Sequence, residues 1–332
     1  MGGKSRYAAA MIQIRLQRDL DLHPAATGRP RAHLSAASGL VFLGESLYVI
    51  ADDEQALGVF PAQGMDRGVL RALFAAELPA PPAQRKANKA DLEILLHVPD
   101  SAAHPHGLLL ALGSGSTARR ERGAWFTFDA AGELQGDAQP LDLAPLYAHL
   151  RASLPALNLE GAVVRDDELI LLQRASRVDR RNALIRLPLL LLRQALSSGR
   201  FAAPAEPPAI DVVDLGECEG VPWGFTDATA LDDGRILFSA VAEDSPDTYR
   251  DGRCLGSAIG WLSPGGRLET LQRIDASVKI EGIAARRAGK SLQLHMVTDA
   301  DDPIIPGQLL QAQVDLPDRW PADAAETRRV PG

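Results

Sequence analysis

Apolar and polar positions along this chain form short runs, and turns rich in Gly and Asp separate these runs. The segment "SGLVFLGESLYVIADD", which starts at Ser38, contains two such runs joined by "LGES", and the turns "RDDE" and "LDDG" join similar pairs further along. Two short apolar runs across a turn of this composition predict a β-hairpin. Helices are expected only in two connections, "DLAPLYAHLRASL" and "PLLLLRQALSS". The pattern therefore predicts an all-β protein.

The hairpins belong to a unit that the chain repeats. Its opening phrase recurs at five places, and the units begin near Ser38, Glu93, Glu160, Asp227 and Glu281. Each unit continues with two more strand candidates, except the last, which has one; residues 11–22, "MIQIRLQRDLDL", can supply its missing strand. Five four-stranded units closed in this way predict a five-bladed β-propeller that forms one domain over residues 1–332. A six-bladed propeller and a non-repeating pair of β-sandwiches are the alternatives.

Composition narrows the function classes. The 332 residues are 46% hydrophobic, which is enough for a large core. The net charge of −8 argues against a general surface for nucleic acid. Because no window reaches ~18 uninterrupted apolar residues and the start lacks a signal peptide, we expect a soluble, cytoplasmic protein with no membrane span. The two cysteines, Cys218 and Cys254, are expected as free thiols.

A ring of oxygen ligands follows from the repeat. In a propeller the first strand of each blade lines the central channel, so one residue from each unit should meet near the axis. That set is Ser38, Glu93, Glu160, Asp227 and Glu281. Buried carboxylates that crowd together either take up protons or hold a cation. Oxygen ligands without His or Cys favour calcium over zinc, and a ring held by backbone hydrogen bonds is the structural alternative.

Charged loops should surround the same mouth of the channel. They contribute candidate catalytic and anion-binding residues: Asp52, Asp53, Glu243, Arg119 and Arg174. Carboxylates could serve as a general base, and arginines could pair with a small anionic ligand held near the metal. A solvated loop face is the alternative interpretation of these charges.

The order of these motifs resembles a known family. The phrases "SGLVFLGESLYVIADD", "LEILL", "LEGAVV" with "QRAS", "GFTDATALDDGRILFSA" and "VKIEGIAA", within residues 36–286, are similar to motifs of the calcium-activated nucleotidases (apyrases) of animals. The resemblance implies a five-bladed propeller in which Ser38, Glu93, Glu160, Asp227 and Glu281 bind one central calcium. The stretch "EGIA…VTDADD" resembles phytase-like esterase propellers. The sequence also resembles bacterial propellers of unassigned function, the group in which we place it.

Three positions depart from the nucleotidase pattern. Gly39 stands where that family has an acidic residue, Glu54 replaces an Arg, and Asp227 stands where Ser is expected. These departures leave calcium binding as the expectation and weaken the case for nucleotide hydrolysis. Three functions therefore remain open: a metal-dependent phosphoester or phosphoanhydride hydrolase, a lactonase or esterase, and a non-catalytic propeller that binds a ligand or a protein.

Overall fold

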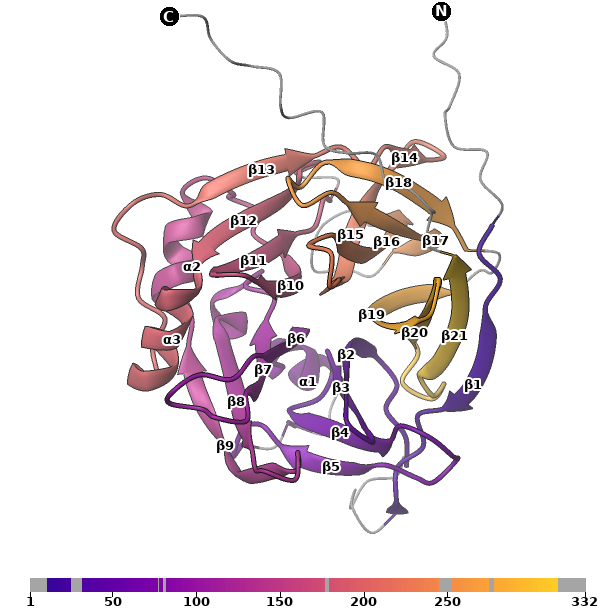
Figure 1. Ribbon diagram of the computed structural model, residues 1–332, viewed down its shortest axis with the longest axis horizontal. Coiled ribbons are helices and arrows are strands. Elements are labelled where there is room, and N and C mark those ends of the chain that lie inside the picture. Colours follow the sequence, from indigo (N-terminus) through magenta and orange to yellow (C-terminus); the bar gives the residue numbers. More distant parts are fainter. Residues whose placement is uncertain are drawn as a thin grey trace, which may run out of the picture.

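The computed structural model describes residues 11–24, 32–76, 78–79, 82–176, 179–244, 252–274 and 278–315. Within these residues, five antiparallel sheets surround a common axis like the blades of a propeller (Figure 1). Strands follow one another outward through each sheet in chain order, except in the blade that contains both ends of the described chain. The predicted five-bladed β-propeller is therefore confirmed, and the six-bladed and sandwich alternatives are wrong.

The bounds of the strands follow the repeat. Blade 1 consists of β2 (Ala37–Leu43), β3 (Ser46–Ala51), β4 (Ala56–Pro61) and β5 (Val69–Ala72). Blade 2 consists of β6 (Leu92–Val98), β7 (Leu108–Gly113), β8 (Arg122–Phe128) and β9 (Leu134–Asp142). Blade 3 consists of β10 (Leu159–Arg165), β11 (Glu168–Gln173), β12 (Asn182–Pro188) and β13 (Ala209–Val213).

The last two blades differ from this pattern in one strand each. Blade 4 consists of β15 (Val221–Ala230), β16 (Ile236–Asp244), β17 (Arg253–Leu262) and β18 (Leu268–Arg273), with the short additional strand β14 (Glu217–Cys218) paired to β15. Blade 5 consists of β19 (Lys279–Ala288), β20 (Ser291–Asp299) and β21 (Gln308–Asp315), and β1 (Arg15–Asp19) completes it. The N-terminal strand therefore closes the ring as its sequence predicted, because β1 pairs with β21.

Neighbouring blades bury both faces of the inner strands. In β7 all six residues of "LLLALG" are buried, so the strand is a continuous apolar run and not an alternating one. Leu110 and Leu112 of β7 belong to the same apolar cluster as Leu171 of β11 in the next blade. This packing between blades fixes the inner strands and positions the residues at their ends.

In the part of the chain that the structure describes, three α-helices lie in connections between strands. The two predicted ones are α2 (Ala144–Arg151) and α3 (Leu189–Ser198), both on the outer side of the ring near blade 3 (Figure 1). The third, α1 (Pro82–Asn88), leads into β6 and was not predicted. No helix within the described residues is long and apolar enough to cross a lipid bilayer. Cys218 and Cys254 are both free.

Candidate functional site

Each innermost strand has a β-bulge, and four of the five bulged residues are those that the repeat singled out. The strand register skips Ser38 in β2, Glu93 in β6, Glu160 in β10 and Glu281 in β19. A bulge takes one residue out of the hydrogen-bonded ladder and changes the direction of its side chain. This geometry explains how a charged residue can stand near the start of a strand that is buried on both faces.

Blade 4 departs from the predicted alignment by one residue. The register of β15 skips Thr226, so Thr226 and not Asp227 is the equivalent of the other four. The Thr226 hydroxyl donates to the Ile280 carbonyl at 2.8 Å, and the Ser38 hydroxyl donates to the Leu92 carbonyl at 2.5 Å. Each acceptor immediately precedes the bulged residue of the next blade. The two hydroxyl members of the set therefore connect adjacent blades.

Asp227 has a different environment from the bulged residues. Its carboxylate accepts hydrogen bonds from the backbone N–H groups of Ala228, at 2.8 Å, and Ile283, at 2.9 Å. Burial raises its pKa well above the ordinary value, although the backbone donors act in the opposite direction. A Cβ on Gly161 would lie 3.1 Å from the Asp227 Cα, so the backbones of blades 3 and 4 approach closely here. Because backbone amides occupy both carboxylate oxygens, we remove Asp227 from the set of proposed metal ligands.

Arg174 lies among carboxylates from three blades. Its guanidinium is 3.3 Å from Glu160, 2.9 Å from Glu243 and 3.8 Å from Glu281. Burial lowers the pKa of Arg174, but the carboxylates outweigh burial and hold this pKa above its ordinary value. The sequence suggested Arg174 as a clamp for an anionic ligand. The structure instead engages it with the protein's own acids.

Lys279 has a similar position in blade 5. Its Nζ atom is 3.2 Å from Glu281, 2.9 Å from Asp301, 3.6 Å from Glu243 and 3.7 Å from Asp299. Burial lowers the pKa of Lys279, but the surrounding carboxylates raise it well above the ordinary value. Lys279 therefore stays charged and connects the acids of blades 4 and 5.

A third cluster joins blades 1 and 2. The Lys89 ammonium contacts Asp52 and lies 3.0 Å from Asp91. The other oxygen of Asp91 accepts hydrogen bonds from Ser114, at 2.5 Å, and from Arg120, at 2.6 Å. Asp91 has a φ of 55°, a left-handed conformation that is uncommon outside glycine and tends to occur at functional sites. Its side chain is thus held on both sides in a strained backbone segment.

Glu93 differs from the other acids of this region in its lack of an ion pair among the described residues. Single ligand atoms of Asp52, Asp91 and Glu93 all lie within 4.8 Å of one another. Among the described residues, the Glu93 carboxylate makes neither a hydrogen bond nor an ion pair, in contrast to Asp52 and Asp91. Its pKa lies well above the ordinary value, first because of burial and then because of repulsion from Glu160 and Asp91. The Lys89 charge lowers this pKa, but Lys89 forms no ion pair with Glu93, in contrast to Asp52 and Asp91.

Carboxyl groups outnumber basic groups at this end of the channel. Within the described residues, the ion pairs and Glu93 bring together eight carboxyls and four basic groups, an excess of four carboxyls: Asp52, Asp91, Glu93, Glu160, Glu243, Glu281, Asp299 and Asp301, with Lys89, Arg120, Arg174 and Lys279. The pKa values of Glu160 and Asp299 are both raised to about 8, and burial is the largest cause for each. Such a group binds either protons or an added cation.

The predicted catalytic residues do not all converge on one point. Asp52 belongs to the triad, and its neighbour Asp53 accepts a hydrogen bond from Ser35 at 3.1 Å. The pKa of Asp53 rises to about 6, first because of burial and then because of the charges of Asp52 and Glu54. Arg119 is exposed and donates to the side chain of Asn88, so it does not reach the group of acids.

Sequence reasoning missed Lys89, Asp91, Lys279 and Thr226. A signal for three of the relevant polar residues was present two positions before the bulge. Asp91 lies two residues before Glu93, Asn158 two residues before Glu160, and Lys279 two residues before Glu281. Asn158 donates a hydrogen bond to Glu160, Lys279 lies 3.2 Å from Glu281, and Asp91 lies beside Glu93. A polar residue at this position therefore indicated a companion for each carboxylate.

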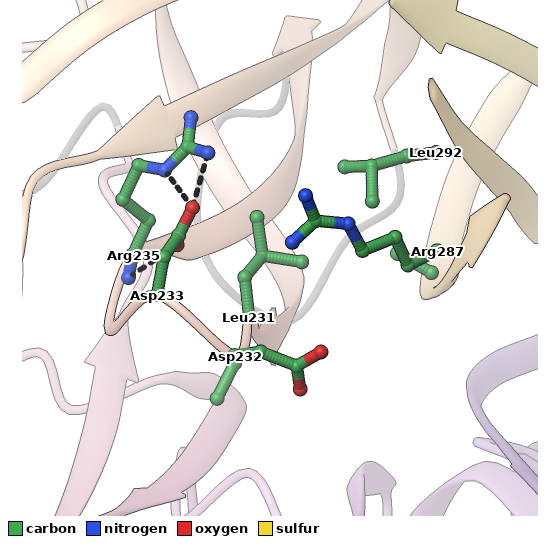
Figure 2. A pocket seen from close by; sticks show the side chains of 8 residues that line it. Leu231, Asp232, Asp233, Arg235, Arg287 and Leu292 are labelled. Atoms are coloured by element: carbon green, nitrogen blue, oxygen red, sulfur yellow. Dashed lines mark hydrogen bonds and ion pairs between the residues drawn. The ribbon is translucent and has the colours of Figure 1, made fainter. Parts of the chain in front are cut away.

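A separate pocket lies at the opposite end of blade 4, beside the β15–β16 turn. The residues that line it come from this turn and from blade 5: Ala230, Leu231, Asp232, Asp233, Arg235, Ala285, Arg287 and Leu292. Figure 2 shows the Arg235 guanidinium turned onto the Asp233 carboxylate, to which its Nε donates at 2.9 Å. This bond stabilises the hairpin turn, and the pocket contains none of the bulged carboxylates.

Several solved structures show a distant similarity to this chain. The Myxococcus xanthus glutaminyl cyclase is 11% identical, with a TM-score of 0.43 over 92% of this chain and 100% of that one. A putative gluconolactonase is 10% identical, with a TM-score of 0.39 over 90% and 78%. The nidogen/laminin complex gives 10% identity and a TM-score of 0.39 over 81% and 77%. Likenesses this distant carry no inference about activity.

The sequence comparisons are more specific about family. No curated protein has a sequence that matches this chain. The relatives named above include neither a calcium-activated nucleotidase nor a phytase-like esterase, so that resemblance remains a hypothesis. One family model matches residues 33–314, which include the strands from β2 to β20 and most of β21. The chain therefore belongs to DUF6929, a family of unknown function.

Proposed function

We propose that this protein is a divalent-cation-binding propeller, with the ion at the channel mouth beside Glu93 and Glu160. The observation that carries the proposal is Glu93, a carboxylate without a hydrogen bond or ion pair among the described residues, in an acidic triad. Glu160 is the first of the acids that repel it, so the negative charge is least compensated between blades 2 and 3. A cation at that position would relieve the repulsion that otherwise favours protonation.

Calcium is the first candidate for the ion. The available ligands are carboxylate oxygens from three blades, namely Asp52 of blade 1, Asp91 and Glu93 of blade 2, and Glu160 of blade 3. Calcium accepts six to eight oxygens in loose geometry, whereas zinc prefers His and Cys in a tetrahedron. The acidic group contains no His or Cys, so a hard ion fits its chemistry better.

A cation-dependent hydrolase is a second candidate, favoured by Asp53. One oxygen of Asp53 is buried without a hydrogen-bond partner among the described residues, and its pKa of about 6 suits a general base. Asp53 adjoins Asp52 of the triad, so it could activate water near the ion. Since Arg174 is engaged by three acids, the ion itself would have to neutralise an anionic substrate.

Calcium titration of the wild type and of Glu93→Gln tests the cation site. Isothermal calorimetry should detect binding to the wild type, and the variant should bind about tenfold or more weakly because it loses a charged ligand. Glu45→Gln changes an exposed residue of the β2–β3 turn and is the matched control. Equal calcium affinity in all three proteins would show that Glu93 is not a ligand, and no binding to the wild type would overturn the proposal.

Turnover is tested separately from binding. Nucleotides, aryl phosphates, lactones and aryl esters are supplied with calcium, and Asp53→Asn is compared with the wild type. A hydrolase predicts turnover of one substrate class that Asp53→Asn reduces by two or more orders of magnitude. Calcium binding without turnover of any class would instead favour a non-catalytic binding propeller.

A further inference from the structure

Lys89 contacts Asp52 and Asp91, two of the four carboxylates that we propose as ligands of the ion. We infer that the Lys89 ammonium is the resident cation of Asp52, Asp91 and Glu93, and that a divalent ion enters by displacing it. The inference rests on the proposed cation site and adds how that site is regulated. In this inference the lysine competes with the divalent ion for the same carboxylates, and so raises the ion concentration that is needed for binding.

The position of Lys89 supports this role. It follows α1 directly and leaves only 9% of its side chain exposed, which is unusual for a lysine. Its ammonium contacts Asp52 of blade 1 and lies 3.0 Å from Asp91 of blade 2. A buried ammonium is stable only among acids, and the triad supplies them.

The triad has the dimensions of a site for one cation. Two oxygens that bind the same calcium at about 2.4 Å can lie at most about 4.8 Å apart. The ligand atoms of Asp52, Asp91 and Glu93 all lie within 4.8 Å of one another. Because the ammonium already contacts two of these acids, the lysine and a metal ion cannot occupy the same space.

The triad can keep its shape when the lysine leaves. Ser114 and Arg120 hold the second oxygen of Asp91 at 2.5 and 2.6 Å, and neither contact involves Lys89. Lysine carries its charge on a flexible four-carbon stem, so its ammonium can swing toward the open mouth while the backbone stays in place. Asp52 and Asp91 then become free to bind a divalent ion together with Glu93.

Displacement has a thermodynamic consequence that separates this proposal from simple cation binding. If the binding-competent state is only the fraction in which the lysine has moved out, the apparent dissociation constant is the intrinsic one divided by that fraction. Removing the ammonium therefore strengthens cation binding, while the loss of a buried partner destabilises the protein without the cation. A lysine that merely held blades 1 and 2 together would give destabilisation without tighter binding.

The test compares calcium binding by the wild type, Lys89→Met and Lys290→Met. Lys290 is exposed on the β19–β20 turn, so its variant is the matched control. Calorimetry and thermal unfolding in a calcium chloride series should show about tenfold or greater tightening for Lys89→Met alone. Equal or weaker affinity in Lys89→Met, together with calcium binding by the wild type, would overturn the displacement and leave the cation site standing.

A measurement on the unmodified protein covers the case in which Lys89→Met fails to fold. Lysine acylation is followed at each position by mass spectrometry, with and without saturating calcium. Displacement predicts that acylation of Lys89 rises several-fold with calcium, whereas acylation of Lys290 does not change. Unchanged acylation of Lys89 in a protein that binds calcium would contradict the inference. If neither the wild type nor Lys89→Met binds calcium, the proposed function and this inference fail together.

Discussion

Replacing Arg174 by Met should strongly destabilise the protein at alkaline pH. The guanidinium lies 2.9 Å from Glu243, 3.3 Å from Glu160 and 3.8 Å from Glu281, and the last two residues are only 4% exposed. Met fills a similar volume without charge, so the change leaves these acids close together with one fewer basic group. The variant therefore isolates the electrostatic contribution of Arg174.

The expected magnitude follows from burial. Breaking a buried ion pair by removing one partner costs about 3–5 kcal/mol, because the remaining charge is left buried. Arg174 has three acidic partners, which places the loss toward the upper end of that range. The acids can limit the loss by binding protons, since burial already raises the pKa of Glu160 to about 8. Arg174 lowers this pKa, so its removal raises the pKa of Glu160 further, and the destabilisation should shrink as the pH falls from about 9.5 to about 7.

Urea unfolding at both pH values measures this effect. Arg181→Met is the matched control, because Arg181 pairs with Asp179 at 2.5 Å but leaves 43% of its side chain exposed. Exposed pairs contribute about 0–1 kcal/mol, so the control should lose little at either pH. A loss below about 1 kcal/mol for Arg174→Met at about pH 9.5, or a loss that does not depend on pH, would refute the interpretation of Arg174 as the charge that stabilises the ring.

Two further predictions concern the backbone around the axis and a buried histidine. Asp227→Ala removes the acceptor of the Ala228 and Ile283 amides and should lower the free energy of unfolding by about 2–6 kcal/mol, because each of these two unsatisfied buried donors costs about 1–3 kcal/mol. Calcium affinity measured on the folded variant should stay unchanged, and a large loss of affinity would return Asp227 to the ligand set. Burial, followed by the charge of Arg286, lowers the pKa of His295 from 6.5 to about 4. Because the unfolded chain binds the proton more readily than the folded protein, His295 should reduce the free energy of unfolding as the pH falls from about 6.5 to about 4, by at most about 3 kcal/mol. His295→Leu should remove that part of the pH dependence in urea unfolding. The same dependence of stability on pH in variant and wild type would contradict this prediction.

The fold could be predicted from the sequence because the signals for its strands and turns are local and recur in every unit. Two apolar runs and a turn indicate each hairpin, and the last of the five units lacks one strand. The N-terminal segment could be assigned to that gap before any coordinates, and β1 does pair with β21. The short strand β14 and helix α1 have no counterpart in the repeat, so the repeat could not predict them.

The site was accessible only in part, because its contacts are not local. The repeat singled out Ser38, Glu93, Glu160 and Glu281, each of which lies at a bulge in the structure. In blade 4 it singled out Asp227 and not the bulged Thr226, because the alignment followed carboxylates. One partner of Lys89 is Asp52, 37 residues away, and Arg174 meets Glu243 across 69 residues. Periodicity indicates which side of a strand a residue occupies, but it does not identify the blade that the residue faces.

Closure of the ring by β1 has a consequence for the order of events during synthesis. The ribosome makes β1 first, but its partner β21 is made last, since Arg15 pairs with Gln311. At about 5–20 residues per second, the 295 residues between Arg15 and Gln311 take about 15–60 s to translate. During that interval the first strand has no ladder to join and the finished blades keep an open edge. A nascent chain of this protein should therefore depend on shielding of that edge until the final strand emerges.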